Sequence, residues 1–255
     1  MLDATPIRAE SPRYGASLLL LPELWAPARL WHAAASFLGH RGWEGQMLEL
    51  RGAGDLGARV AAVVEHARAL PARPVLIGHG AGAIVALEAA RAGAGAAAVL
   101  LAPLLAGSAP LRTLTRRRDA IASVLLGRPM PPPPAAHFGD PPATVASQLA
   151  PETTRAVLDV VRGRPPAPGA IGVPVLVAGG DRDPLLSPEA AAALATRVGG
   201  EHLVLPGAAH WPLVESRWQQ TVDLLHRWLV RQLGEALLEF HAEAMEERDA
   251  EPDES

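Results

Sequence analysis

The fold of this chain is decided by residues 74–88, which read Pro74-Val-Leu-Ile-Gly-His-Gly-Ala-Gly-Ala-Ile-Val-Ala-Leu-Glu88. An apolar run, a glycine-rich turn and an alanine-rich helical pattern follow one another there, which predicts a buried strand that leads directly into a helix. Gly78 and Gly82 have no side chains and therefore permit the close approach of strand and helix that a sharp turn requires. This turn is the first candidate for a functional site.

Short apolar runs and helical patterns alternate on both sides of this turn, which is typical of an α/β fold with a parallel sheet covered on both faces. The runs are nearly continuous rather than alternating, as expected when both faces of a strand are buried. The predicted strands are Ser17–Leu21, Gly45–Leu50, Pro74–Ile77, Ala97–Leu101, Pro174–Ala178 and His202–Leu205. The predicted helices are Ala28–Gly39, Leu56–Leu70, Ala81–Ala92, Pro188–Val198 and a last one that begins near Val214 or Ser216.

The alternation is interrupted between about residues 104 and 172. These residues form a proline-rich insertion, with short helical patterns near Arg118–Leu126 and Thr153–Val161. A connection of this length between core strands predicts a lid over a site. Arg112 and the run 116–118 lie in this insertion. They either attract an anionic substrate or form a solvated helix face, which is the more common role of such a cluster.

Charge and composition exclude several classes of function. The chain has 255 residues, 23 Lys plus Arg, 27 Asp plus Glu and no Cys, which excludes thiolate catalysis, disulfides and cysteine-based zinc sites. Residues 235–255 hold nine acids and one base, and the rest carries a mild excess of bases without a basic stripe. We therefore expect an N-terminal segment over 1–15, a domain over 16–233, a solvated acidic extension over 234–255 and no nucleic-acid partner.

The N-terminal residues include acids and lack the apolar segment of a secretion signal. The longest uncharged stretch, Ala92–Leu111, is broken by glycine and proline, so it does not predict a membrane span. We expect a cytoplasmic protein whose partner is a small-molecule substrate or ligand. Nothing in the sequence specifies its oligomeric state.

Residues 78–82, Gly-His-Gly-Ala-Gly, have the small-x-nucleophile-x-small spacing of a nucleophile elbow. At these residues the chain resembles the α/β-hydrolase superfamily. The stretch Pro174–Pro184 is similar to the family's strand and acid-bearing loop, and His202–Pro212 to its last strand and histidine loop. Positions 80, 183 and 210 follow the family order of nucleophile, acid and histidine. The resemblance extends from about Ser17 to Leu233.

The resemblance implies that a carboxylate orients His210, which then acts as a general base near neutral pH. Asp183 is the favoured acid because the family places it three residues after a glycine, here Gly180, and before a turn. Asp181 is the alternative.

The family's nucleophile is missing, because position 80 is Gly80 where relatives carry Ser, Cys or Asp. Glycine has no side chain to attack a carbonyl, so an acyl-enzyme at this position is excluded. Glycine also adopts the positive φ of such a turn with little strain, which explains how the fold tolerates it. A natural loss and an engineered replacement leave the same trace in the sequence.

The backbone N–H groups of Leu24 and Ala81 are the expected oxyanion-hole donors by position. Glu23 lies beside Leu24 and opposes the charge of an oxyanion. It is either a solvent-facing or helix-capping residue, which is the more common case, or an acid, base or alternative nucleophile. His79, Trp25 and Trp211 are candidates for a substrate pocket, with packing beside the turn as their more common role.

No phosphate loop, dinucleotide turn or metal-spaced histidine pair is present, so we expect no cofactor and no metal. The leading hypothesis is an enzyme for a small apolar carbonyl compound: an ester, thioester, lactone or β-dicarbonyl. His210 would activate a water or abstract a proton, and the space left by the absent nucleophile would hold that water. The alternatives are a catalytically silent ligand-binding or scaffolding protein and a serine esterase whose nucleophile was replaced.

Overall fold

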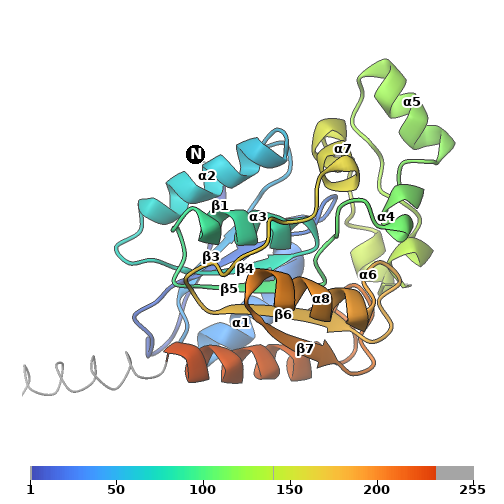
Figure 1. Cartoon of the computed structure of the whole chain (residues 1–255). Coiled ribbons are helices and arrows are strands. Elements are labelled where there is room, and N and C mark those ends of the chain that lie inside the picture. Colours follow the sequence, from blue (N-terminus) through green and yellow to red (C-terminus); the bar gives the residue numbers. More distant parts are fainter. Residues whose placement is uncertain (1, 140, 234–255) are drawn as a thin grey trace, which may run out of the picture.

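The computed structural model of the chain describes residues 2–139 and 141–233, and shows a central sheet between layers of helices (Figure 1). The acidic extension expected over 234–255 lies outside the described residues.

The described residues form a seven-stranded sheet in the order β1-β3-β2-β4-β5-β6-β7. Its strands are β1 Ala4–Ile7, β2 Leu18–Leu21, β3 Gly45–Leu48, β4 Val75–His79, β5 Ala97–Leu101, β6 Val175–Gly180 and β7 Glu201–Leu205. All neighbouring pairs are parallel except β1 with β3. The predicted α/β class with a mainly parallel sheet is therefore confirmed.

The strand missing from the prediction is β1, so about six expected strands are seven in the structure. Its sequence, Ala-Thr-Pro-Ile, contains a proline and exposes its first three residues, so it has no apolar run to detect. Proline is tolerated here because β1 lies at the edge of the sheet, where one side of the strand needs no partner.

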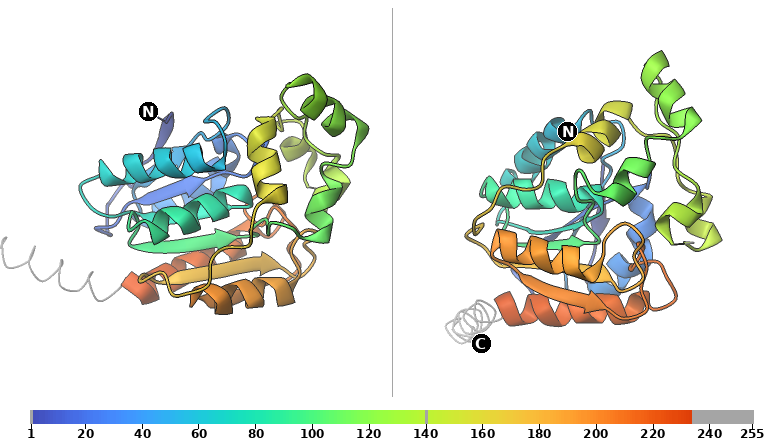
Figure 2. Two further views of the ribbon diagram at one scale, coloured as in Figure 1. Left: turned by 45° about the horizontal axis from the view of Figure 1, so that its top comes forward. Right: turned by 45° about the vertical axis from the view of Figure 1, so that its right-hand side comes forward.

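Helices cover both faces of the sheet (Figure 2). They are η1 Ala28–Trp31, α1 His32–His40, α2 Leu56–Arg68, α3 Ala81–Arg91, α8 Pro188–Val198 and the helical residues 218–233. Leu18 and Leu20 of β2 pack in a core with α1 and residues 218–233, whereas Leu19 and Leu21 pack in a second core with α2, α3 and α8. This division explains why the strands read as continuous apolar runs, because both of their faces are buried.

The insertion lies at the carboxyl end of the sheet and is built of short helices (Figures 1 and 2). They are α4 Ala109–Thr113, α5 Arg118–Leu126, η2 Ala135–Phe138, α6 Ala143–Ala146 and α7 Thr154–Arg162. The two helical patterns read from its sequence correspond to α5 and α7. A bridge between Met130 and Glu152 ties its two halves together.

The turn between β4 and α3 has the close approach expected of its glycines. A Cβ on Gly78 would lie 2.1 Å from the carbonyl oxygen of Gly82, and one on Gly82 would lie 2.3 Å from that of Leu21. Gly80 itself has φ +57° and ψ −113°, a backbone conformation that strains any residue with a side chain. The turn therefore places residue 80 at the carboxyl end of the central strands.

Candidate active site

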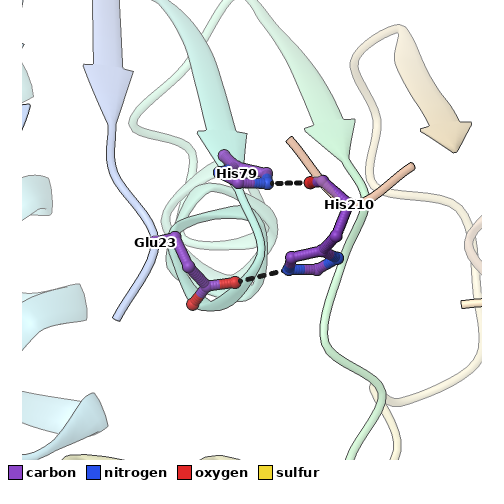
Figure 3. Close-up of side chains that lie close together, drawn as sticks. All are labelled: Glu23, His79 and His210. Carbon is purple, nitrogen blue, oxygen red and sulfur yellow. Dashed lines mark hydrogen bonds and ion pairs between the residues drawn. The ribbon is translucent and has the colours of Figure 1, made fainter. Parts of the chain in front are cut away.

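Parallel strands deliver the candidate residues to one edge of the sheet, because their carboxyl ends all lie there. Glu23 follows β2, His79 ends β4, Asp183 follows β6 and His210 follows β7. Figure 3 shows that Glu23 and His210 point toward each other, with His79 beside them. The structure therefore brings together residues that are up to 187 positions apart in the sequence.

The carboxylate of Glu23 occupies the space where a side chain on residue 80 would begin. An ideal Cβ on Gly80 would lie 1.4 Å from Glu23 Oε2, so a side chain there and this carboxylate exclude each other. The expectation that a water fills this space is wrong for the same reason. The expectation of a solvent-facing Glu23 is also wrong, because only 1% of this residue is exposed.

The two expected oxyanion-hole donors converge on one atom of the protein itself. Glu23 Oε1 accepts hydrogen bonds from Leu24 N–H at 2.5 Å and from Ala81 N–H at 3.1 Å. Ala81 is the first residue of α3, so the positive end of the helix dipole also stabilises the carboxylate. Glu23 does not oppose an oxyanion beside these donors; it takes the place of one.

Asp183 and Glu23 hold the His210 ring from opposite sides. His210 Nδ1 lies 3.0 Å from Asp183 Oδ2, and His210 Nε2 lies 3.1 Å from Glu23 Oε2. Asp183 Oδ1 accepts the N–H groups of Leu185 and Leu186, which fixes its direction. The alternative acid, Asp181, is exposed and instead accepts a backbone N–H in the turn that follows β7.

His210 carries a positive charge in this arrangement. Burial lowers the pKa of its imidazole, but the carboxylates of Asp183 and Glu23 more than offset this and raise the pKa to about 10. The ring is therefore an imidazolium at neutral pH, and the expectation of a general base poised near neutrality is wrong while Glu23 remains in place. The physical reason is the second carboxylate, whose contact with the ring depends on the fold.

His79 supports the loop that carries His210. Its Nε2 lies 2.6 Å from the carbonyl oxygen of His210 and donates its hydrogen to that oxygen. Burial, followed by the charge of His210, lowers the pKa of His79 to about 3, so its ring is neutral. This hydrogen bond fits the packing role beside the turn, and a substrate contact by His79 stays a prediction.

Aromatic residues enclose the network. The ring of Phe138, from η2 of the insertion, stacks on His210 with centroids 5.5 Å apart, and Trp211 packs edge-on against both rings. Phe138 was not predicted, since one aromatic within a proline-rich segment gives no sign of what it will cover. Met130, whose carbonyl oxygen accepts a hydrogen bond from Trp25, was not predicted as part of the site either.

Trp25 connects the site to the insertion. Its Nε1–H donates to the carbonyl oxygen of Met130, and its own carbonyl oxygen accepts the N–H of Ala150, both at 3.0 Å. Trp25 also has φ +64°, a strained conformation for a residue with a side chain. Because Trp25 follows Leu24 directly, the insertion holds the backbone next to the Leu24 N–H that donates to Glu23.

The site is closed as described. Trp25 and Trp211, the expected pocket residues, are both buried in the core. Cavities of about 300 and 440 Å³ lie elsewhere, the first between the turn after β7 and the final helix and the second between the end of α5 and the start of α7. The Trp211 Nε1–H is buried without a hydrogen-bond partner among the described residues. His210 and Glu23 are likewise almost fully buried, at 0% and 1% exposed.

Glu23, His79 and His210 each offer one atom that could bind a metal, and these atoms lie within 4.8 Å of one another. Glu23 and His210 already form an ion pair, and His79 Nε2 already donates to a carbonyl oxygen. A metal would have to displace these interactions, so the cluster fits a proton-carrying network better than a metal site.

Among the described residues, no helix combines the length and the apolar character needed to cross a bilayer.

Comparisons with known proteins agree with this architecture. A family model described as the alpha/beta hydrolase family matches residues 13–224. A thermophilic esterase from Thermogutta terrifontis is 21% identical, with 90% of this chain and 93% of that chain covered and a TM-score of 0.65. An enol-lactonase from Burkholderia xenovorans LB400 is 16% identical, with coverage of 89% and 96% and a TM-score of 0.66.

The type II thioesterase BorB from the borrelidin biosynthetic cluster is 20% identical, with coverage of 88% and 96% and a TM-score of 0.62. A search of curated protein sequences finds no match. At these identities the solved structures show the fold alone. The family model covers most of the sequence, and on that ground the chain belongs to the alpha/beta hydrolase family.

Proposed function

We propose that this chain is a hydrolase whose nucleophile is the Glu23 carboxylate, with His210 and Asp183 as its proton-transfer pair. One observation carries the proposal: Glu23 Oε2 lies 1.4 Å from the Cβ position of residue 80 and also contacts His210. Glu23 thus substitutes in space for the missing side chain. A buried charged network of this kind is often no more stable than apolar packing, which favours a functional reason for its presence.

The occupied oxyanion hole supports attack on a saturated carbon. Glu23 Oε1 already takes both N–H donors, so a substrate carbonyl oxygen has no donors left. When Oε2 attacks a saturated carbon, a new O–C bond forms and the leaving group departs with the bonding electron pair. Glu23 then becomes an ester whose carbonyl oxygen is still held by Leu24 and Ala81.

The charge of His210 supports a leaving group that needs a proton. The imidazolium donates its Nε2 proton to the departing oxygen and becomes neutral, and the alkylated Glu23 no longer raises the pKa of the ring. Neutral His210 then takes a proton from a water, which attacks Cδ of Glu23. The ester bond breaks, the product oxygen takes the second proton of that water and leaves as an alcohol, and both the carboxylate and the imidazolium are restored.

The substrate class is therefore a small, largely apolar molecule with an oxygen leaving group on a saturated carbon, such as an epoxide or a strained lactone. The aromatic walls formed by Trp25, Phe138 and Trp211 suit an apolar substrate. The insertion acts as the lid that admits it. Ordinary esters and thioesters fit less well, because Glu23 would have to leave the oxyanion-hole donors first.

Trapping the ester tests this proposal. The full-length protein is incubated with a panel of aryl epoxides and β-lactones, and hydrolysis is measured alongside the mass of the peptide that contains Glu23. We expect His210→Gln to accumulate an adduct on Glu23 with the β-lactones, whose carboxylate leaving group departs without a proton, because the adduct is no longer hydrolysed. Glu23→Gln gives neither adduct nor turnover, a loss on the order of 10³-fold or more. Asp181→Asn, an acid in the same loop as Asp183, is the matched control and keeps full turnover.

A catalytically silent ligand-binding protein is the second candidate, favoured by the closed site in which the polar atoms of Glu23, Asp183 and His210 have partners. It predicts no turnover and no adduct across the panel, together with saturable ligand binding that survives His210→Gln. Turnover that is unaffected by Glu23→Gln would overturn the nucleophile assignment.

A further inference from the structure

The outer helix of the insertion, α5, exposes an unusual amount of apolar surface. Leu125 is 79% exposed, Leu126 60%, Ile121 47% and Val124 38%. Among the described residues, the other large apolar side chain with comparable exposure is Val204, on β7. Single exposed apolar side chains are ordinary, but a contiguous group of them marks an interaction surface.

Apolar side chains and an arginine form one stripe along α5. Arg118, Ile121 and Leu125 follow at intervals of three and four residues, so they share a helical face. Arg128 comes after Gly127, whose left-handed backbone ends the helix. An arginine therefore stands at each end of the apolar group. Two views show α5 projecting from the insertion on the side away from the sheet (Figures 1 and 2).

Arginines that form no ion pair with the described residues precede and follow α5 in the sequence. Arg112, Arg116, Arg118 and Arg128 are exposed and form no ion pair with any described residue. Arg117 is different, because it is bound to Asp119 and to the carbonyl oxygen of Pro131. A cavity of about 440 Å³ lies beside the stripe, and its lining combines apolar side chains such as Val124 and Leu158 with the cationic Arg128.

We propose that α5 docks on an anionic lipid surface, with its apolar side chains at the headgroup–acyl boundary and the four arginines on the headgroups. A short amphipathic helix with basic residues around an apolar face is suited to this boundary. The apolar side chains project from a ridge, and the cations lie at both of its ends. This shape fits a soft charged plane better than a protein groove. The assignment does not depend on the catalytic role of Glu23.

Vesicle flotation with the full chain tests the docking surface. We expect binding to vesicles of phosphatidylcholine and phosphatidylglycerol in a 3:1 ratio and weak binding to phosphatidylcholine alone. Because the attraction is partly electrostatic, binding falls in 0.5 M NaCl. Leu125→Ser with Leu126→Ser weakens binding about tenfold or more, as expected for two apolar side chains that leave the lipid. Arg118→Gln with Arg128→Gln weakens binding to the anionic vesicles about tenfold and leaves binding to neutral vesicles unchanged.

Matched controls come from the opposite end of the molecule. Val204→Ser removes an exposed apolar side chain and Arg227→Gln removes an exposed arginine, and both leave vesicle binding unchanged. Equal binding to neutral and anionic vesicles would overturn the proposal, as would the absence of binding to either. So would self-association in sedimentation experiments that Leu125→Ser abolishes, because it would identify a second copy as the occupant.

Discussion

Gly80 and Glu23 form one packing unit, since the absence of a side chain at one residue makes room for the carboxylate of the other. From the sequence we expected Gly80 at the nucleophile position and a pairing of Asp183 with His210, and His210 Nδ1 lies 3.0 Å from Asp183 Oδ2. The sequence did not predict the direction of Glu23, because a side chain after a strand can face solvent or the site and only the surrounding backbone N–H groups decide which. The electrostatics of His210 depend on that direction.

The first prediction concerns this packing unit. Gly80→Ala destabilises the protein by about 3 kcal/mol or more, from a positive-φ strain of order 1–3 kcal/mol and the collision with Glu23. In a Glu23→Gly background the same change costs only the strain. Urea denaturation of the four proteins in this double-mutant cycle measures the difference. Equal costs in both backgrounds would show that the two residues do not compete for space.

A second prediction concerns stability against pH. In the folded protein His210 has a pKa of about 10, so between pH 6.5 and pH 10 it binds more protons than it does in the unfolded chain. Its contribution to the free energy of unfolding is therefore complete below pH 6.5 and is lost as the pH rises toward 10. In the folded protein His79 has a pKa of about 3, so between pH 3 and pH 6.5 it binds fewer protons than it does in the unfolded chain. Its contribution to the free energy of unfolding is therefore complete above pH 6.5 and is lost as the pH falls toward 3. These two groups together place a stability maximum near pH 6.5. Denaturation across this range checks it, and His79→Gln removes the acid-side loss that comes from His79.

At the scale of elements, the insertion is fastened to the domain by a buried ion pair. Arg59 Nη2 of α2 lies 2.7 Å from Glu152 Oε1 of the insertion, and both side chains are almost fully buried. Glu152 also exchanges backbone hydrogen bonds with Met130, whose carbonyl oxygen accepts the Nε1–H of Trp25. The pair was not predicted, since Arg59 and Glu152 are 93 residues apart and neither lies in a recognisable motif.

The third prediction follows from this ion pair. Glu152→Gln leaves the charge of Arg59 buried without its partner and costs about 3–5 kcal/mol, whereas Arg59→Met with Glu152→Met recovers most of the loss. Limited trypsin digestion reports the local effect, because exposed arginines at the start of α5 are cleavage sites. We expect faster cleavage after Arg116 and Arg118 in the single variant. Unchanged cleavage and stability would show that other contacts hold the insertion.

At the scale of the whole molecule, the sheet could be predicted from the sequence, but the packing of the insertion over it could not. Continuous apolar runs, proline at helix starts and glycine turns specify the strand and helix order from β2 to the last helix. The short helices α4, α6 and η2 lie in a proline-rich segment with little periodicity, and their packing depends on the domain beneath them. The position of Phe138 over His210 is a tertiary result that no local pattern encodes.

The fourth prediction concerns unequal local stability. Backbone amides of β4 and β5 lie in the centre of a sheet buried on both faces, so they exchange hydrogen slowly, with protection close to the global value. Amides in the insertion exchange faster, because its helices are short and α5 is mostly exposed. Hydrogen exchange followed by mass spectrometry measures both. Equal protection would show that the insertion unfolds only with the sheet.

The double hydrogen bonding of Trp25 has a consequence for the chemistry. A displacement of the insertion would therefore also displace Trp25 and, through the chain, the Leu24 N–H that donates to Glu23. On the proposal that Glu23 is the nucleophile, uncovering the site and adjusting the hydrogen bond that orients its carboxylate are then one movement.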